Sequence, residues 1–288
     1  MKKNINLISL ICPLIFSLCF LAKTMQAQEM TKIYTKSMAV PSSSAFEIIN
    51  AQALDYEMHG SMSSIGSEEG YVLKPGFNQK PCLIIKNYRV ETWSKDSIKQ
   101  VVKIEVTPEQ NNPKPAKDLL TNLKISIPKK TGGIYVIDGN MNLKKMELIN
   151  GFFRRDRNTF ILDNGKKYNI RQLVITSTLY LPKQSNIFLN TDYVGLSLGD
   201  LEGQLTINAK YGYIKANNVK EVTGNIQNFN ADFKDVEKMT LNASYSTISA
   251  LSVQELQIGS LELLANQRKS TGLFNAPNDA LSLSLIHI

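Results

Sequence analysis

The sequence predicts an all-β fold: a β-solenoid of parallel β-helix-like coils, each of about 17 residues, preceded by a β-rich N-terminal region with one short helix. Two observations support this prediction. The stretch 205–219 recurs at 222–236 and again at 239–253, with apolar, Thr and Asn positions in step. Elsewhere, apolar and polar residues alternate with a period of two, which is typical of strands with one buried face.

The N-terminus has the layout of a secretory signal peptide. Lys2 and Lys3 precede an apolar run over 5–22, and Ala27 is a small residue suited to cleavage. The competing interpretation is a retained membrane anchor, because the run is near the lower limit for crossing about 30 Å of hydrocarbon. We therefore expect an exported protein, located in the periplasm, on the outer-membrane surface or outside the cell.

The other terminus, "LSLIHI" at 283–288, resembles the translated end of a transposon-based sequencing adapter. We expect these residues not to be native, so that the native C-terminus is missing. The predicted organisation is a signal peptide at 1–27, a β-rich N-terminal region at 28–180 and solenoid repeats at 181–282. The native part is long enough for a substantial hydrophobic core.

The mature chain is moderately basic. Loss of the signal peptide removes Lys2, Lys3 and Lys23 and no acidic residue, so the formal charge falls from +8 to +5. A positive excess on an exported protein favours an anionic glycan, lipopolysaccharide or a membrane surface over nucleic acid as the partner. An ordinary soluble surface with slightly more Lys than Glu explains the charge more simply.

Cys82 is the single cysteine that remains after cleavage, so no internal disulfide can form. It lies in an apolar run, which favours a small buried side chain. A thiolate nucleophile with His59 as its base is the functional alternative, but nothing near either residue supports it.

The N-terminal region contains strand, hairpin and helix signals. Apolar residues alternate with Lys and Glu over 98–106, as in a strand with one wet face. Asn164 and Gly165 separate two strand-like runs, and type I′ hairpin turns need positive φ at both central positions. Residues 115–124 predict a helix, because Pro115 suits a first turn and three leucines share one face.

Three stretches of this region have both a functional and a structural interpretation. A cluster of arginines could bind phosphate or carboxylate, but a solvated hairpin tip explains it more simply. The Ser- and Gly-rich stretch 59–70 is interpreted as a flexible linker. A group of aromatic residues is interpreted as core and not as a ligand platform. The arginines are Arg154, Arg155 and Arg157, and the aromatic residues are Phe152, Phe153 and Phe160.

The repeats align in columns at steps of 17 residues, and a step back of 18 adds a further unit in which Asn190 matches Asn208. Coils that stack about 4.8 Å apart pair every backbone group and place equivalent side chains on top of one another. The apolar columns then form a core, and the asparagines form a hydrogen-bonded ladder. The columns are Leu205, Val222, Met239 and Leu256; Thr206, Thr223, Thr240 and Gln257; Asn208, Asn225, Asn242 and Gly259.

An uncapped coil would leave an open sheet edge, so we expect the N-terminal region to cover one end of the stack. The tyrosines at 193, 211 and 245 form a further column, which Asn228 interrupts. Both the asparagine and the tyrosine columns are better explained by structure than by binding.

Three segments resemble a family of exported Bacteroidetes proteins, the adhesin-like β-strand-repeat proteins of the DUF4097 kind. They are "ETWSKDSIKQVVKIEV" around Trp93, "AKDLLTNLKISIP" after it, and "LPKQSNIFLNTDYVGLSLGDLEGQLTINAKYGYIKA" from Leu181 to Ala216. With the signal peptide, the resemblance covers most of the native chain. It implies a role in adhesion and carries no known functional residues.

The sequence therefore predicts a non-enzymatic cell-envelope or surface protein, an adhesin-like binding or scaffold module built on a β-solenoid. It predicts no catalytic, cofactor-binding or metal-binding residues and no cofactor. The expected partners are an envelope or extracellular glycan or protein and not nucleic acid; membrane proximity and oligomeric state stay open.

Two alternatives remain. A polysaccharide-active β-helix enzyme would need paired carboxylates, and Asp192, Asp200 and Glu202 are those near the best-formed coil. They lie at turn positions and match no calcium-binding repeat. The second alternative is a periplasmic partner in envelope-stress signalling, which the family resemblance suggests and the residues do not test.

Overall fold

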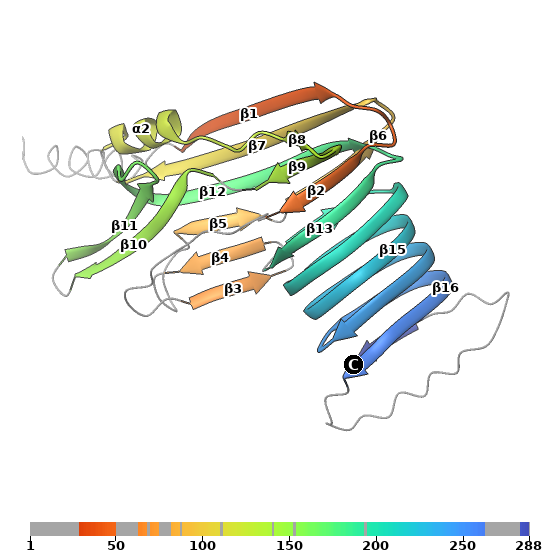
Figure 1. The fold of residues 1–288 in the computed structure, drawn as a ribbon. Coiled ribbons are helices and arrows are strands. Elements are labelled where there is room, and N and C mark those ends of the chain that lie inside the picture. Colours follow the sequence, from red (N-terminus) through yellow and green to blue (C-terminus); the bar gives the residue numbers. More distant parts are fainter. Residues whose placement is uncertain are drawn as a thin grey trace, which may run out of the picture.

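The computed structural model is mostly β-structure, with its strands joined in a large curled sheet (Figure 1). Helix α2 (Lys114–Asn122) is the one helix among the described residues. The predicted signal peptide lies outside them. The structure describes residues 29–49, 63–67, 70–74, 82–86, 88–109, 112–139, 141–151, 154–192, 195–262 and 283–287.

The strands pair both between neighbours in sequence and across long distances. In chain order they are β1 (Met30–Ala39), β2 (Ala45–Ile49), β3 (Ser63–Ser67), β4 (Gly70–Lys74), β5 (Leu83–Lys86), β6 (Tyr88–Trp93), β7 (Ser97–Pro108), β8 (Lys129–Thr131), β9 (Ile134–Asp138), β10 (Leu143–Gly151), β11 (Arg154–Leu162), β12 (Lys167–Pro182), β13 (Asn186–Asp192), β14 (Gly195–Leu198), β15 (Leu201–Ser244), β16 (Thr247–Glu262) and β17 (Leu283–His287).

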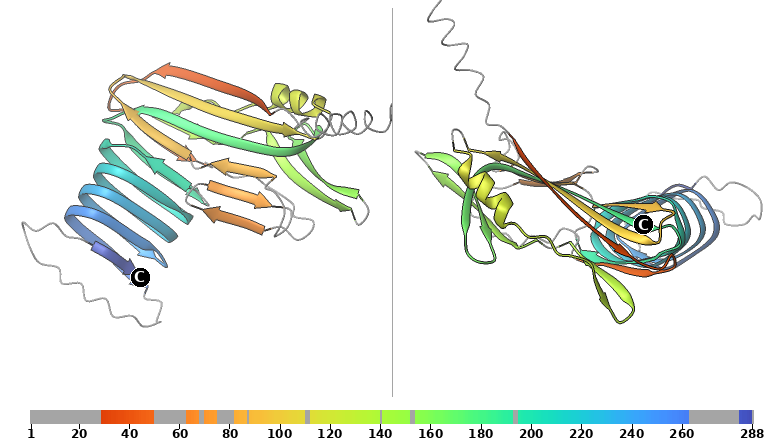
Figure 2. Two further views of the ribbon diagram at one scale, coloured as in Figure 1. Left: turned by 180° about the vertical axis from the view of Figure 1, so that it is seen from behind. Right: turned by 90° about the horizontal axis from the view of Figure 1, so that it is seen from above.

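Long antiparallel strands form the N-terminal sheet, in which β7 lies between β1 and β12. The predicted alternation is confirmed along β7: Ile98, Val102, Ile104 and Val106 are buried, and the residues between them are partly exposed, except for the buried Gln100. One face of the sheet is therefore dry, and the other faces solvent. Figure 2 shows these long strands extending beyond the repeats toward α2, β10 and β11.

Helix α2 covers the dry face at the far end of this sheet. Its apolar side places Leu119 and Leu120 in a core with residues of β7, β11 and β12. The Lys32 ammonium donates to the Leu120 carbonyl at 2.8 Å, and the Tyr34 hydroxyl lies 2.9 Å from the Leu120 and Leu123 carbonyls. These contacts satisfy carbonyls at the helix C-terminus. The predicted helix is confirmed, and it ends slightly before its predicted boundary.

N-terminal strands continue the paired strands of the repeats on two sides. On one side β6 pairs in parallel with β14, where Tyr88 lies opposite Leu196. On the other side β9, β2 and β13 follow one another in parallel, and Phe46 lies opposite both Tyr135 and Ile187. The first repeat therefore has no free edge on these two sides, because N-terminal backbone supplies its partners.

Equivalent residues of successive repeats are neighbours across paired strands. β13 pairs with β15 at an offset of 18 residues, as for Asn190 and Asn208, and β15 pairs with β16 at an offset of 17. The predicted register is thus confirmed. Leu205, Val222 and Met239 are each at most 1% exposed and belong to one core, which also includes Phe46 from the N-terminal region. This core crosses the predicted boundary between residues 180 and 181.

Left-handed backbone marks one corner of the repeats. Tyr211, Asn228 and Tyr245 have φ of 54°, 49° and 50°, and follow one another at steps of 17 residues. Asn tolerates this conformation better than Tyr does, so Asn228 fits the corner although it interrupts the tyrosine column. Tyr211 and Tyr245 are 46% and 38% exposed, which makes the column external to the core.

Two segments form strands that the sequence did not predict, β3 and β17. Residues 63–67 were interpreted as part of a linker, but they form β3, which makes an antiparallel hairpin with β4. The hairpin is held by β5, which pairs with β4 and in turn with β12, so tertiary pairing overrides the high Ser and Gly content. Residues 283–287, predicted to be adapter-derived, form β17 against β16.

Candidate functional site

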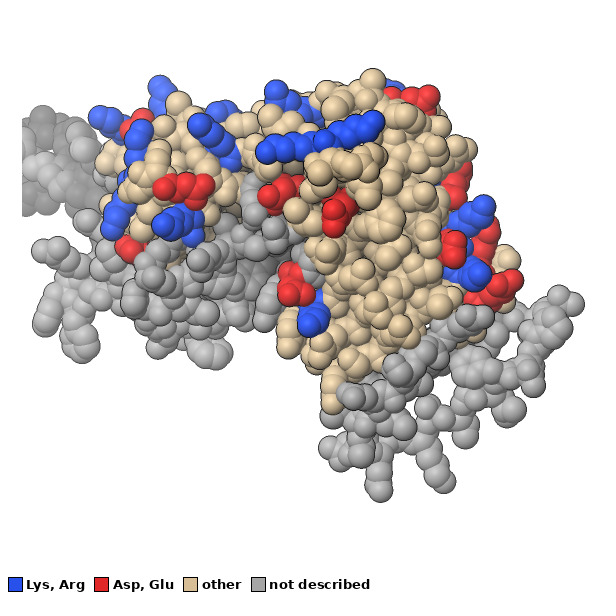
Figure 3. All heavy atoms as spheres, in the orientation of Figure 1, with Lys and Arg blue, Asp and Glu red and all other residues tan. Residues whose placement is uncertain are grey.

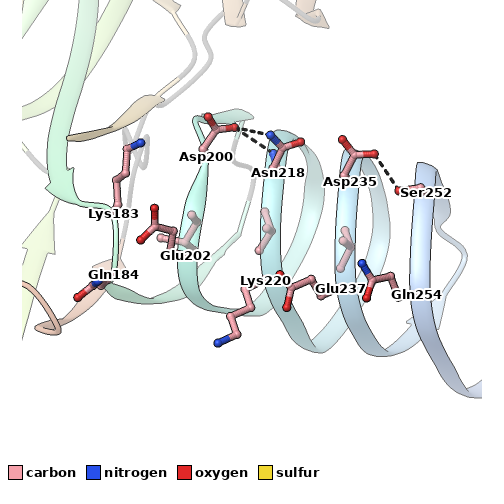
Figure 4. A pocket seen from close by; sticks show the side chains of 13 residues that line it. Lys183, Gln184, Asp200, Glu202, Asn218, Lys220, Asp235, Glu237, Ser252 and Gln254 are labelled. Carbon is pink, nitrogen blue, oxygen red and sulfur yellow. Dashed lines mark hydrogen bonds between the residues drawn. The ribbon is translucent and has the colours of Figure 1, made fainter. Parts of the chain in front are cut away.

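A groove with a volume of about 900 Å³ crosses successive repeats at the corner where the chain passes from one wall to the other (Figure 4). Two rows of polar side chains line it. The first row is Asp200, Asn218, Asp235 and Ser252, and the second is Gln184, Glu202, Lys220, Glu237 and Gln254.

Alternation along the backbone produces these two rows. Leu201, Val219 and Val236 lie between them in sequence, and each is 2% exposed because it points into the core. The residues on either side of each therefore point outward. The repeat then brings each outward pair into line with the next, so two polar side chains from each of these repeats line the groove.

Hydrogen bonds connect the first row from repeat to repeat. Asn218 donates to the Asp200 carboxylate from its side-chain amide at 3.0 Å and from its backbone amide at 3.3 Å. The Ser252 hydroxyl donates to the Asp235 carboxylate at 2.8 Å. Thr92 also donates to the Asp200 carbonyl, which ties the groove to β6. These carboxylates therefore hold neighbouring repeats together.

The groove is acidic, although the whole chain is basic. Four carboxylates line it, against the ammonium groups of Lys183 and Lys220. In the view of Figure 3, Lys and Arg gather over the N-terminal sheet and α2, and the broad wall of the repeats carries few charges. An anionic partner, which the formal charge of the chain favoured over nucleic acid, thus does not fit this groove.

Only two of the three carboxylates considered from the sequence come together. Asp200 and Glu202 line this groove, whereas Asp192 lines a second hollow of about 360 Å³ beside the asparagine column. The sequence interpretation also missed Asp235 and Glu237. Their signal was present, because they follow Asp200 and Glu202 two repeats later.

The second hollow contains the predicted asparagine ladder. The Asn225 side chain donates to Asn208 at 3.1 Å, and the Asn242 side chain donates to Asn225 at 2.9 Å. The Asn225 side chain is thereby both donor and acceptor in the middle of the column. The predicted hydrogen-bonded ladder is thus confirmed for Asn208, Asn225 and Asn242.

Other residues singled out from the sequence do not form a site in the described residues. Cys82 and Phe160 are fully buried, as predicted. His59, Phe152 and Phe153 lie outside the described residues, so the structure does not test the pairing of Cys82 with His59. Arg154, Arg155 and Arg157 lie on β11, and their side chains are outside the described part.

Burial makes the Cys82 thiol a weak acid, since desolvation raises its pKa to about 11 from an ordinary value of 9.0. At pH 8 the thiolate fraction is then about 0.1%, against about 10% for an exposed thiol. We expect a thiol reagent at pH 8 to modify the native mature chain about 100-fold more slowly than the urea-unfolded chain.

A reagent that releases a coloured product when it reacts with the thiol lets the absorbance measure both rates. Equal rates would contradict burial of this thiol.

The same rise in the pKa of Cys82 affects stability. The folded state favours the neutral thiol. The contribution of this thiol to the free energy of unfolding is therefore complete below pH 9 and declines as the pH rises through about 11.

Within the described ranges, no three His, Cys, Asp or Glu side chains are grouped as a metal site would require. No helix in those ranges is long and apolar enough to cross a membrane.

Comparisons with known proteins add little to this picture. No family model and no curated protein matches the chain. Among solved structures, the crystal structure of a "Putative lipid binding protein" from Parabacteroides distasonis is similar at 11% identity, over 79% of this chain and 77% of that chain, with a TM-score of 0.21. A similarity this low does not define a fold or a ligand.

Proposed function

We propose that residues 181–282 form a β-solenoid of about 17-residue coils and that the exported chain is a non-enzymatic, adhesin-like binding or scaffold module of the cell envelope. The parallel pairing of β13, β15 and β16 at offsets of 18 and 17 residues supports the solenoid. The continuous core and the asparagine ladder support it independently.

The observation that carries the binding function is the repetition of polar groups along the acidic groove. Neighbouring coils present amide, carboxylate and hydroxyl groups at intervals of about 4.8 Å. A ligand made of repeating units can therefore form the same weak contact several times, and such contacts add up through effective concentration. The rigid coils reduce the ordering cost of binding.

The chemistry of the groove favours an extended, neutral, hydroxyl-rich polymer such as a neutral polysaccharide. Hydroxyl groups both donate to carboxylates and accept from amides and ammonium groups, and the groove offers all three. An anionic polymer would meet more carboxylates than ammonium groups.

A binding module is favoured over an enzyme because Asp200 and Asp235 already accept hydrogen bonds from adjacent coils. These bonds occupy carboxylate lone pairs that a general acid or base would use to exchange a proton with a substrate. The third carboxylate considered for the enzyme, Asp192, lines a different hollow.

Binding of the mature full-length chain to neutral and acidic polysaccharides tests this function. We expect retention on a neutral polysaccharide, with affinity reduced about tenfold in the double variant Glu237→Ala, Gln254→Ala, because about 1.4 kcal/mol of hydrogen bonding is lost. Calorimetry measures the change. The matched control is Lys215→Ala, Lys234→Ala, which removes exposed side chains outside both hollows and should leave binding unchanged.

Absence of binding to every neutral polysaccharide and envelope fraction would contradict the proposal. So would equal affinity of the groove variant and the wild type. Release of reducing sugars, abolished by Asp200→Asn, would instead establish the enzyme alternative.

A further inference from the structure

An aromatic pair lies on the solvent face of the N-terminal sheet. Trp93, the single tryptophan of the chain, stacks on Tyr180 with ring centroids 5.2 Å apart and planes inclined by 28°. Trp93 lies opposite Pro182, so the rings meet diagonally across the paired strands β6 and β12. Leu179 and Leu181, which alternate with Tyr180, are fully buried on the opposite face. The two rings themselves are only half-buried.

Two lysines lie over these rings. The Lys95 ammonium is 5.1 Å from the centroid of Trp93, and the Lys99 ammonium is 5.7 Å from that of Tyr180. Lys99 is also the residue opposite Tyr180 in β7. The Trp93 indole donates to the Ser97 carbonyl at 2.7 Å, which fixes the orientation of its ring. The four side chains form one surface, here named the aromatic platform: Trp93, Tyr180, Lys95 and Lys99.

Glu91, an acidic residue beside the platform, already has a cationic partner. Glu91 lies opposite Tyr180 on the other side, in β6, and is paired with Arg89 on the same strand. Glu91 therefore does not compete with an anionic ligand for the ammonium groups of Lys95 and Lys99. The cation–π contacts that hold them are weak at an exposed site, about 0.5–1 kcal/mol each, so a ligand can displace the lysine stems from the rings.

We propose that the aromatic platform binds a sugar ring that carries a carboxylate, as in a polymer of uronic acids. A pyranose ring presents a face of C–H bonds that packs against the negative face of an aromatic ring. Its carboxylate accepts charge-assisted hydrogen bonds from the lysine ammonium groups. The platform carries two lysines, whereas carboxylates predominate in the acidic groove. The inference does not depend on the groove binding any ligand.

Stacking on aromatic rings next to lysines also suits nucleic-acid bases, but the platform favours a sugar. Single-stranded nucleic acid is bound by several aromatic rings along a basic groove that follows the backbone. Here one pair of rings and two lysines match one or two sugar units. An oligonucleotide is therefore included as a competing ligand in the test.

Because Trp93 is the single tryptophan, its fluorescence reports directly on this site. We expect hexagalacturonate to change the emission of the mature full-length chain with saturable binding, and neutral maltohexaose to bind at least about tenfold more weakly. The double variant Lys95→Ala, Lys99→Ala should bind hexagalacturonate at least about tenfold more weakly. The control Lys103→Ala, on the same strand and face as Lys99, should bind like the wild type.

Several outcomes would overturn the proposal: no fluorescence change with millimolar hexagalacturonate, equal affinity for the two hexasaccharides, or undiminished binding by the lysine double variant. Tighter binding of a ten-residue oligothymidylate than of hexagalacturonate would overturn it in favour of nucleic acid. The groove variant Glu237→Ala, Gln254→Ala should leave this titration unchanged, so failure here and failure of the groove function are distinguishable.

Discussion

Gly224→Ala is expected to destabilise the protein by about 3–5 kcal/mol. The backbone of Gly224 has φ of +129°, a conformation that side chains rarely permit. A Cβ at this position would lie 2.0 Å from the carbonyl oxygen of Ile207 and 2.8 Å from its amide nitrogen. Both atoms belong to the backbone of the neighbouring repeat, so neither can move without breaking the pairing.

Urea unfolding followed by far-UV circular dichroism measures this effect. The matched control is Gly199→Ala, for which φ is ordinary and the nearest atom, a carboxylate oxygen of Glu91, would be 3.4 Å from the new Cβ. The control should change the free energy of unfolding by less than about 1 kcal/mol. Equal stability of the two variants would show that the repeats approach each other less closely than the structure indicates.

Phe46→Ala is expected to cost about 3–5 kcal/mol, because it empties a fully buried site. The Phe46 ring stacks on Tyr135 at 5.4 Å, and its strand lies between β9 and β13. Phe46 therefore joins the N-terminal region to the first repeat. Since the core is continuous from there to Val253, the whole core should lose stability together.

Two probes test that cooperativity. Trp93 fluorescence reports on the N-terminal sheet, and far-UV circular dichroism reports on all strands; their urea midpoints should shift equally in Phe46→Ala. Ile33→Ala is the control, because this β1 residue is 61% exposed and should change stability by less than about 0.5 kcal/mol. Separate transitions for the two probes would contradict cooperative unfolding of this core and the core under α2, which share strands β7 and β12.

The repeats were the most predictable part of the molecule. Their register follows from a local pattern that recurs at a fixed interval, and the hydrogen bond from Asn225 to Asn208 joins residues that the pattern had already aligned. Burial on β7 and the position of α2 were predictable for a similar reason, because each depends on the period of a single element.

The hairpin of β3 and β4 was less predictable, since local composition and tertiary pairing disagree there. Ser and Gly favour a loop, yet β5 provides backbone partners for β4. The candidate site was half predictable. The sequence drew attention to Asp200 and Glu202, but it did not show that Asp192 lies in a different hollow.

The sequence by itself determined the strand-like alternation, the interval between repeats and the identity of the side chains that stack, because all three are properties of short segments repeated along the chain. Only the tertiary structure decided that β2 and β6 continue the repeats, that Thr92 contacts Asp200, and that Trp93 meets Tyr180. Those contacts join residues that are far apart in sequence. Alternation specifies which face of a strand is buried but not which strand lies beside it, so long-range strand order is set by how the whole core packs.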